Sequence, residues 1–156
     1  MGKPPRVGSQ HALGASTAPA RLPSHAMKYL LDTDILIDVL RGYLPAVEWM
    51  ATLTKTPAVV SVCVMELIQG CRSKADLKAV EQLIAPLEVW YPTESEMQLA
   101  LEEFRAHFLK ARVSVIDAIV GAVAHARATP LCTFNTRHYK PLNIELYHPY
   151  PKAHTP

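Results

Sequence analysis

The segment MKYLLDTDILID, residues 27–38, is a short apolar run that ends abruptly in carboxylates. We predict that Tyr29 to Leu31 form a central β-strand, because strands covered on both faces are apolar on both sides. Asp32 then falls at the carboxyl end of this strand, where open α/β sheets bind their ligands. Two interpretations stay open from this segment alone: Asp32 or Thr33 caps the helix that follows, or Asp32 takes part in chemistry.

The rest of the chain alternates between short apolar runs and helical patterns. Further strands are predicted at residues 57–61, 87–91, 130–134 and 144–146. Helices are predicted between them, at residues 34–41, 45–53, 62–71, 74–84 and 93–110 and around residues 113–124. Strands that alternate with helices form a parallel sheet with helices on both faces. We therefore expect a three-layer α/β/α sandwich with a central parallel sheet of four to five strands.

The length of 156 residues fits one domain. Residues 1–26 contain four prolines and no periodic apolar pattern, so we expect a disordered N-terminal extension there. The folded domain is expected at residues 27–148, followed by a C-terminal tail at residues 149–156. No apolar run approaches the roughly 18 residues that span a membrane, and the three cysteines form no Cys-x-x-Cys pair. We expect a cytoplasmic protein with no membrane segment.

The charge of the chain is unevenly distributed. Its net charge is +2, but Lys3, Arg6 and Arg21 precede Met27 and no acidic residue does. From Met27 onward there are 13 basic and 14 acidic residues, which gives a net charge of −1. This part of the chain would therefore bind nucleic acid through a local basic rim or a bound cation, not through its overall charge.

Four polar residues stand out: Asp32 after the first strand, Glu66 and Asp117 in apolar helical segments, and Asn135 after the strand at residues 130–134. Helices packed on a parallel sheet place their ends beside the strand termini, so these side chains can converge on one pocket. Carboxylates brought together repel unless a cation neutralises them. Oxygen ligands suit Mg²⁺ or Mn²⁺, which also accept phosphate oxygens as ligands. The pattern predicts metal-dependent hydrolysis of phosphodiesters by a metal-activated water.

These and neighbouring acids also have structural interpretations. We expect Asp34 to be the helix N-cap and Asp38 to be solvated. Taken alone, Glu66 would pair with a nearby basic side chain, Arg72 or Lys74, and Asp117 would cap its own helix.

Four segments, in this order, resemble the PIN domain family and, within it, the VapC-type toxin ribonucleases of toxin–antitoxin pairs. They are LLDTDILI at residues 30–37, VMELIQG at 64–70, VIDAIVGA at 115–122 and LCTFNTRHY at 131–139. The resemblance implies a PIN-like fold and a metal-dependent endoribonuclease. It implies that Asp32, Glu66 and Asp117 bind Mg²⁺ or Mn²⁺. Asn135 takes the fourth position of the catalytic set, where an amide supplies no charge.

Thr33, Arg137 and His138 are candidate contacts to an RNA substrate, with a surface loop as the alternative setting for His138. The resemblance also implies protein partners. The implied partners are a small antitoxin that covers the acidic pocket and a second copy of the chain in a homodimer. The apolar residues available for such contacts, unless they belong to the core, are Leu36, Val39, Leu40, Trp49 and Met50.

Two other functions fit parts of the sequence. Asp32-Thr33-Asp34-Ile35 after an apolar strand resembles the opening motif of haloacid-dehalogenase-type phosphatases, in which Asp32 would be the nucleophile and Asp34 the acid. That interpretation leaves Glu66 without a role. A non-catalytic PIN-like module that binds RNA or a protein is the other alternative, and Asn135 is the residue that favours it.

Overall fold

A computed structural model describes residues 27–152 as a parallel sheet flanked by helices. The expected disorder of residues 1–26 lies outside the described residues. All five predicted strands form, and each is short: β1 (Leu30–Leu31), β2 (Ala58–Val60), β3 (Glu88–Trp90), β4 (Leu131–Cys132) and β5 (Leu146–Tyr147). Every pair of neighbouring strands is parallel, in the order β3-β2-β1-β4-β5.

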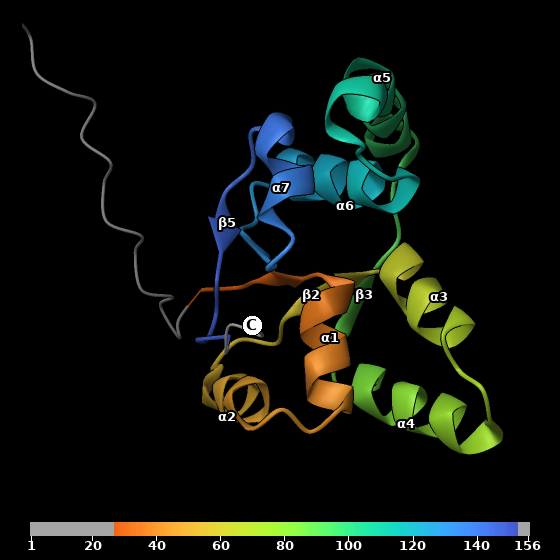
Figure 1. The fold of residues 1–156 in the computed structure, drawn as a ribbon. Coiled ribbons are helices and arrows are strands. Elements are labelled where there is room, and N and C mark those ends of the chain that lie inside the picture. The colour runs from red at the N-terminus through yellow and green to blue at the C-terminus, as the bar shows by residue number, and fades with distance from the viewer. Residues whose placement is uncertain (1–26, 153–156) are drawn as a thin grey trace, which may run out of the picture.

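Helices cover both faces of this sheet, which confirms the predicted three-layer fold. They are α1 (Thr33–Leu40), α2 (Leu44–Thr52), α3 (Ser61–Gln69), α4 (Lys74–Ile84), α5 (Glu94–Ala111), α6 (Val115–Ala126), α7 (Thr136–Tyr139) and the 3₁₀ helix η1 (Lys140–Leu142). In Figure 1, α5, α6 and α7 lie above the sheet, and α1, α2 and α4 lie below it. No helix within residues 27–152 has the length and apolar character needed to cross a bilayer.

The strand order reverses at β1. The chain builds β2 and β3 outward on one side of β1, then returns to add β4 and β5 on the other side. Leu30 in β1 is therefore in register with both Ala58 in β2 and Leu131 in β4. Such a reversal opens a crevice at the carboxyl ends of the two central strands. The residues that follow β1 and β4 meet at this crevice.

The core fills the space between the sheet and its helices. Leu30, Leu31 and Leu131 are completely buried, as expected for strands covered on both faces. Helix α6 is small and apolar, and Gly121 within it allows η1 to approach closely. A Cβ atom at Gly121 would lie only 2.4 Å from Cδ1 of Leu142.

Three features of the fold differ from the sequence-based expectations. The prediction that Asp38 is solvated is wrong, because the residue is buried and its Oδ2 accepts hydrogen bonds from the Tyr150 hydroxyl (2.9 Å) and Lys152 Nζ (3.1 Å). Tyr150, placed in the C-terminal tail by the prediction, packs into the core, so the folded part extends past residue 148. The short helices α7 and η1 were not predicted.

Glu96 links α5 to the end of α6 and, through Arg127, to the edge strand β3. A capping box begins α5, with Thr93 as N-cap and Glu96 accepting from the Thr93 amide. The same carboxylate accepts two hydrogen bonds from Arg127, from Nε at 2.7 Å and Nη2 at 3.0 Å. The Arg127 guanidinium in turn lies 4.6 Å from the ring centre of Trp90. The Arg127 hydrogen bonds lower the pKa of Glu96.

We expect Glu96→Gln to lower the free energy of unfolding by about 1–2 kcal/mol at pH 7, because a glutamine keeps the capping box and loses only the charge. Since the pKa of Glu96 is lowered by folding, its stabilising effect is present above the ordinary value near 4.5 and disappears as the pH falls through the lowered value. Thermal unfolding of both proteins from pH 7 to pH 3 measures this. A difference in melting temperature that stays constant over this range would contradict it.

Candidate active site

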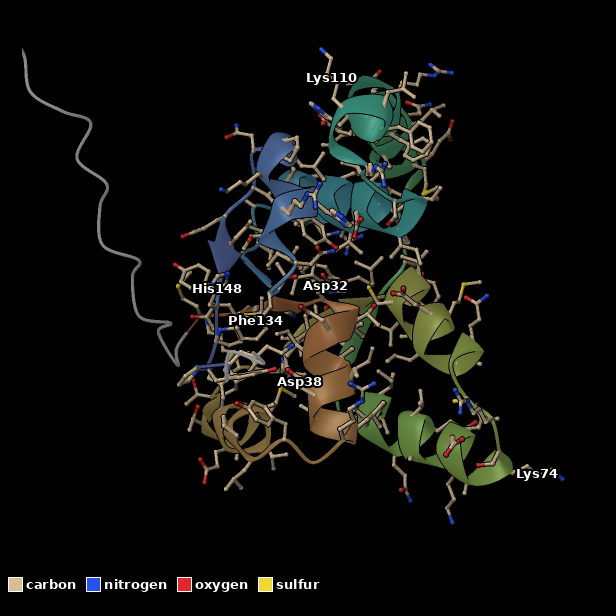
Figure 2. All side chains as sticks on the ribbon, viewed as in Figure 1. Asp32, Asp38, Lys74, Lys110, Phe134 and His148 are labelled. Carbon is tan, nitrogen blue, oxygen red and sulfur yellow. The ribbon has the colours of Figure 1, made fainter. Side chains whose placement is uncertain are left out.

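A pocket of about 190 Å³ lies at the crevice between β1 and β4. Its walls come from the segments after these strands and from α1, α3 and the start of α6: Asp32, Thr33, Asp34, Ile37, Glu66, Ser114, Ile116, Asp117 and Asn135. All four polar residues singled out in the sequence thus surround one pocket, together with Thr33. Figure 2 shows Asp32 between α1 and the layer formed by α6 and α7. Arg137, by contrast, lies exposed on α7 outside the pocket wall.

Asp32 performs both of the roles left open by the sequence: it caps α1 and it faces the pocket. Its Oδ1 accepts a hydrogen bond from the Thr33 amide (2.8 Å), and its Oδ2 accepts one from the Thr133 hydroxyl (2.8 Å). The side chain is nonetheless buried. Burial, and to a smaller extent the nearby Asp34, together raise the pKa of Asp32 to about 7, against the lowering effect of these hydrogen bonds. A neighbouring cation would stabilise the ionised form of such a buried carboxylate.

Asp34 is a pocket residue that the sequence did not identify. The prediction that Asp34 is the N-cap is wrong, because Asp32 occupies that position. Instead, Asp34 Oδ2 accepts a hydrogen bond from the Phe134 amide (2.8 Å), which joins the start of α1 to the segment after β4. Its Oδ1 is buried and has no hydrogen-bond partner within residues 27–152. Burial raises the pKa of Asp34.

Asp117 occupies the first turn of α6. It forms a reciprocal capping box with Ser114: the Asp117 amide donates to Ser114 Oγ (3.0 Å), and the Ser114 amide donates to Asp117 Oδ2 (3.0 Å). The capping role considered in the sequence is therefore real, but the buried carboxylate also lines the pocket. The same Oδ2 lies 3.0 Å from Nδ1 of His138 on α7.

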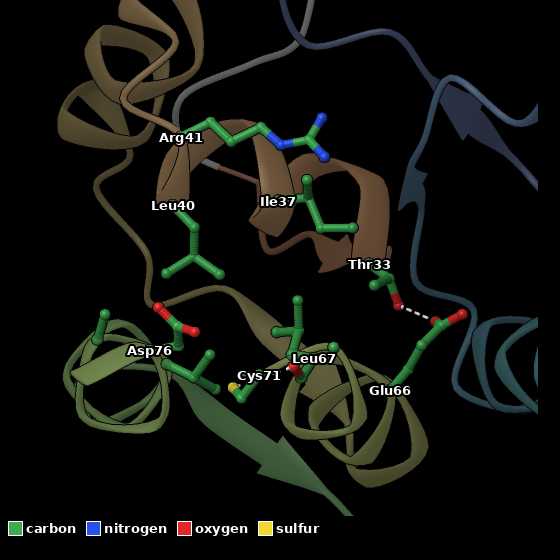
Figure 3. A pocket seen from close by; sticks show the side chains of 11 residues that line it. Thr33, Ile37, Leu40, Arg41, Glu66, Leu67, Cys71 and Asp76 are labelled. Carbon is green, nitrogen blue, oxygen red and sulfur yellow. Dashed lines mark hydrogen bonds between the residues drawn. The ribbon is translucent and has the colours of Figure 1, made fainter. Parts of the chain in front are cut away.

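Glu66 reaches the pocket from α3, on the opposite wall. Its Oε2 accepts a hydrogen bond from the Thr33 hydroxyl at 2.6 Å, drawn as a dashed line in Figure 3. Among the described residues it forms no ion pair with Arg72 or Lys74. Thr33 is thus the residue that links this acid to the end of β1.

Thr133 is a second residue that sequence reasoning missed. Its hydroxyl is completely buried directly after β4. It donates to Asp32 and accepts a hydrogen bond from the Asn135 amide at 2.9 Å. One hydroxyl thereby fixes the first acid and the turn that carries Asn135. Its position after a buried strand was the available signal, and it matches that of Asp32.

The chemistry of the pocket fits a hard divalent cation. The donors that line it are carboxylate, hydroxyl and amide oxygens, and no lysine or arginine is among the residues of its wall. The buried Oδ1 of Asp34 adds an acceptor that no described donor satisfies. As the side chains stand, no three acidic, histidine or cysteine groups within residues 27–152 are gathered closely enough to hold a metal ion.

Comparisons with known proteins agree with this architecture. Residues 29–141 match the PIN domain family model. The chain is 32% identical over 124 residues to Ribonuclease VapC10 of Mycobacterium tuberculosis, covering 78% of this chain and 92% of that protein. Among solved structures, a DNA-bound VapBC from Salmonella typhimurium matches with a TM-score of 0.67 and 25% identity over 78% of this chain and 97% of that one. A toxin–antitoxin complex from Klebsiella pneumoniae matches with a TM-score of 0.64 and 22% identity, over 80% and 100% of the two chains.

The raised pKa of Asp32 predicts that this acid destabilises the metal-free fold at neutral and alkaline pH. The folded protein binds a proton here up to about pH 7, whereas the unfolded chain releases it near pH 3.8, so stability falls as the pH rises between these values. We expect Asp32→Asn, which keeps an N-cap acceptor, to unfold at a higher temperature than the parent at pH 8 in EDTA. The difference, at most roughly 4 kcal/mol, should shrink toward pH 4.

Asp76→Asn is the matched control for this comparison, because Asp76 is an exposed acid in the first turn of α4 whose pKa is lowered. It should give no stabilisation at pH 8. If the melting temperatures of the parent and Asp32→Asn changed with pH in the same way, Asp32 would be ionised in the folded protein at no cost in stability, which would contradict the prediction.

Proposed function

The chain belongs to the PIN domain family, and from this premise we propose that it is an endoribonuclease that cuts RNA with the help of Mg²⁺ or Mn²⁺. The observation that carries the proposal is the single pocket at the strand-order reversal, lined by Asp32, Glu66 and Asp117. The relative from M. tuberculosis, of which the chain covers nearly the whole length, is a ribonuclease. We further propose that the chain is the toxin of a toxin–antitoxin pair, as the matched complexes suggest.

Asp32, Glu66 and Asp117 would hold the cation. When bound, a divalent ion of this kind lowers the pKa of a water molecule and stabilises negative charge on a phosphate. Hydrogen bonds from Thr133 and the Thr33 amide hold Asp32 in place, and the capping box holds Asp117.

Neutral and basic side chains around the acids complete the proposed site. Asn135 lines the pocket without adding negative charge, so it does not repel a phosphate group. Arg137 and Lys140 are exposed on the segment that follows. We assign these two cations to the RNA backbone beyond the cleaved bond, because phosphate contacts position a nucleic acid without reading its sequence.

The phosphatase alternative does not survive. The chain matches the PIN domain family over residues 29–141, and its curated relative is a ribonuclease, not a phosphatase. Membership of the PIN domain family also accounts for Glu66, which the phosphatase interpretation left without a role. The non-catalytic binding module is the remaining alternative, and a cleavage assay decides it.

We propose that the antitoxin occupies a groove next to the acidic pocket. The groove has a volume of about 420 Å³ and runs between α1, α3 and α4 (Figure 3). Ile37, Leu40, Leu67 and Val80 give it apolar walls, and Thr33, Ile37 and Glu66 line both the groove and the pocket. A segment seated in the groove could extend a basic side chain into the pocket and occupy the place of the cation.

The residues considered for contact with a second copy of the chain are exposed only in part. Leu36 and Trp49 are buried in the core, whereas Leu40 is exposed. Large apolar side chains are also exposed on α3 and α5, at Met65, Ile68, Met97, Leu101, Phe108 and Leu109. We place the homodimer contact on these two helices.

The central experiment is RNA cleavage by purified protein without partners. We expect cleavage of cellular RNA with Mn²⁺ or Mg²⁺ and none in excess EDTA. Asp117→Asn should lower the rate at least about 100-fold, because even residues that support metal ligands are worth 10- to 100-fold. Asp76→Asn, which changes an exposed acid outside the pocket, should cut like the parent. Full activity of Asp117→Asn would overturn the site, and absence of cleavage by the parent would favour the binding module.

The toxin role is tested in living cells. Induced expression of the parent should arrest bacterial growth, and Asp32→Ala, expressed at the same level, should relieve the arrest because it removes a carboxylate of the pocket. Immunoblotting checks the level of each protein and colony counts measure growth. If the arrest persists with Asp32→Ala, it does not arise from RNA cleavage at this site.

A further inference from the structure

His138 contacts two residues of the acidic pocket without lining it. Its Nδ1 lies 3.0 Å from Asp117 Oδ2 and 3.1 Å from the side-chain amide of Asn135. The histidine side chain is 32% exposed, whereas that of Asp117 is 9% exposed. Both contacts involve the same ring nitrogen, and Nε2 has no partner among the described residues.

The location of the ring proton follows from the acceptor it meets. An ionised carboxylate only accepts hydrogen bonds, so the 3.0 Å contact requires a proton on Nδ1. This holds whether the ring is neutral or charged. The structure places Asn135 Nδ2 at this contact, but a protonated Nδ1 cannot face an NH₂ group favourably. We therefore assign the Asn135 side-chain oxygen to this position, where it shares the one Nδ1 proton with Asp117 Oδ2. The NH₂ group of Asn135 is then a donor for other contacts.

The short helix α7 creates this arrangement. Asn135 precedes the helix, and the His138 amide bonds to the Asn135 carbonyl across one turn (3.3 Å). The turn brings the ring of His138 back over the Asn135 side chain and beside the first turn of α6. Oδ2 of Asp117 then receives two donors, the Ser114 amide and His138 Nδ1, and Oδ1 is left without a partner in residues 27–152.

We propose that His138 is a positioning residue that fixes one oxygen of Asp117 and thereby leaves the other for the cation. It also holds Asn135 by its carbonyl oxygen, so that the Asn135 NH₂ group donates to a substrate phosphate and the amide is not a metal ligand. The link to catalysis rests on the proposed function, whereas the hydrogen bonds of His138 are independent of it.

The proposal predicts a specific order among three substitutions. Asn at position 138 places an amide nitrogen where Nδ1 stands, Gln reaches only the position of Nε2, and Leu has no donor. Mn²⁺ binding is measured by calorimetry on RNA-free protein. We expect His138→Leu and His138→Gln to weaken the affinity about tenfold or more and His138→Asn to remain within about threefold of the parent. The rate of RNA cleavage should follow the same order.

Two further measurements separate positioning from other roles. Nitrogen NMR of the metal-free parent should show a proton on Nδ1 of His138. His107→Leu is the matched control, because it removes a histidine–carboxylate pair of 3.2 Å on α5, outside the pocket, and should leave Mn²⁺ affinity unchanged. Melting temperatures confirm that each variant is folded.

Three outcomes would overturn the proposal: parent-like Mn²⁺ affinity in His138→Leu, loss of cleavage with unchanged affinity, or a bare Nδ1 in the NMR spectrum. The second would make His138 a direct substrate contact. Failure of the proposed function is distinct, since it would appear as absence of RNA cleavage by the parent while the Mn²⁺ affinities still differed.

Discussion

Carboxylates share this small pocket without a basic side chain because helix N-termini and neighbouring backbone amides hold them. Asp32 is the N-cap of α1, and Asp117 closes the capping box of α6. The first turn of a helix presents unpaired N–H groups and a partial positive charge, which stabilise an anion without neutralising it. Burial still outweighs this effect at Asp32, as its raised pKa shows. The same carboxylates therefore begin the helices and give the pocket its negative charge.

The strand order brings these helix starts together. Because β4 pairs with β1, the segment after β4 lies beside the start of α1 and exchanges hydrogen bonds with it through Thr133 and Asp34. The pocket is thus built from segments about a hundred residues apart. A shift of β4 by one residue would move Thr133 to the other face and remove the donor of Asp32.

Sequence reasoning found the elements whose patterns are local. The predicted bounds of α4 agree with the structure at both ends, and those of α5, predicted at 93–110, differ by one residue at each end. Helix α7 was not predicted, since four residues carry no helical periodicity. Asp38 was wrongly expected to be solvated, because its hydrogen-bond donor Tyr150 is 112 residues away in the sequence. The acids after strands and inside apolar helices were visible in the sequence. The role of Thr133 was not, because its position after a buried strand does not show that its hydroxyl contacts Asp32.

The end of the chain is part of the support for the pocket. Tyr150 packs against Phe134, with 5.0 Å between ring centres, and the amide of Phe134 is the donor to Asp34. The hydroxyl of Tyr150 also reaches Asp38 on α1. A protein that ended at residue 148 would lose the Tyr150 ring that packs against Phe134. The buried carboxylate of Asp38 would also lose its hydroxyl donor. Proteolytic removal of residues 149–156 would therefore act on the nuclease pocket itself.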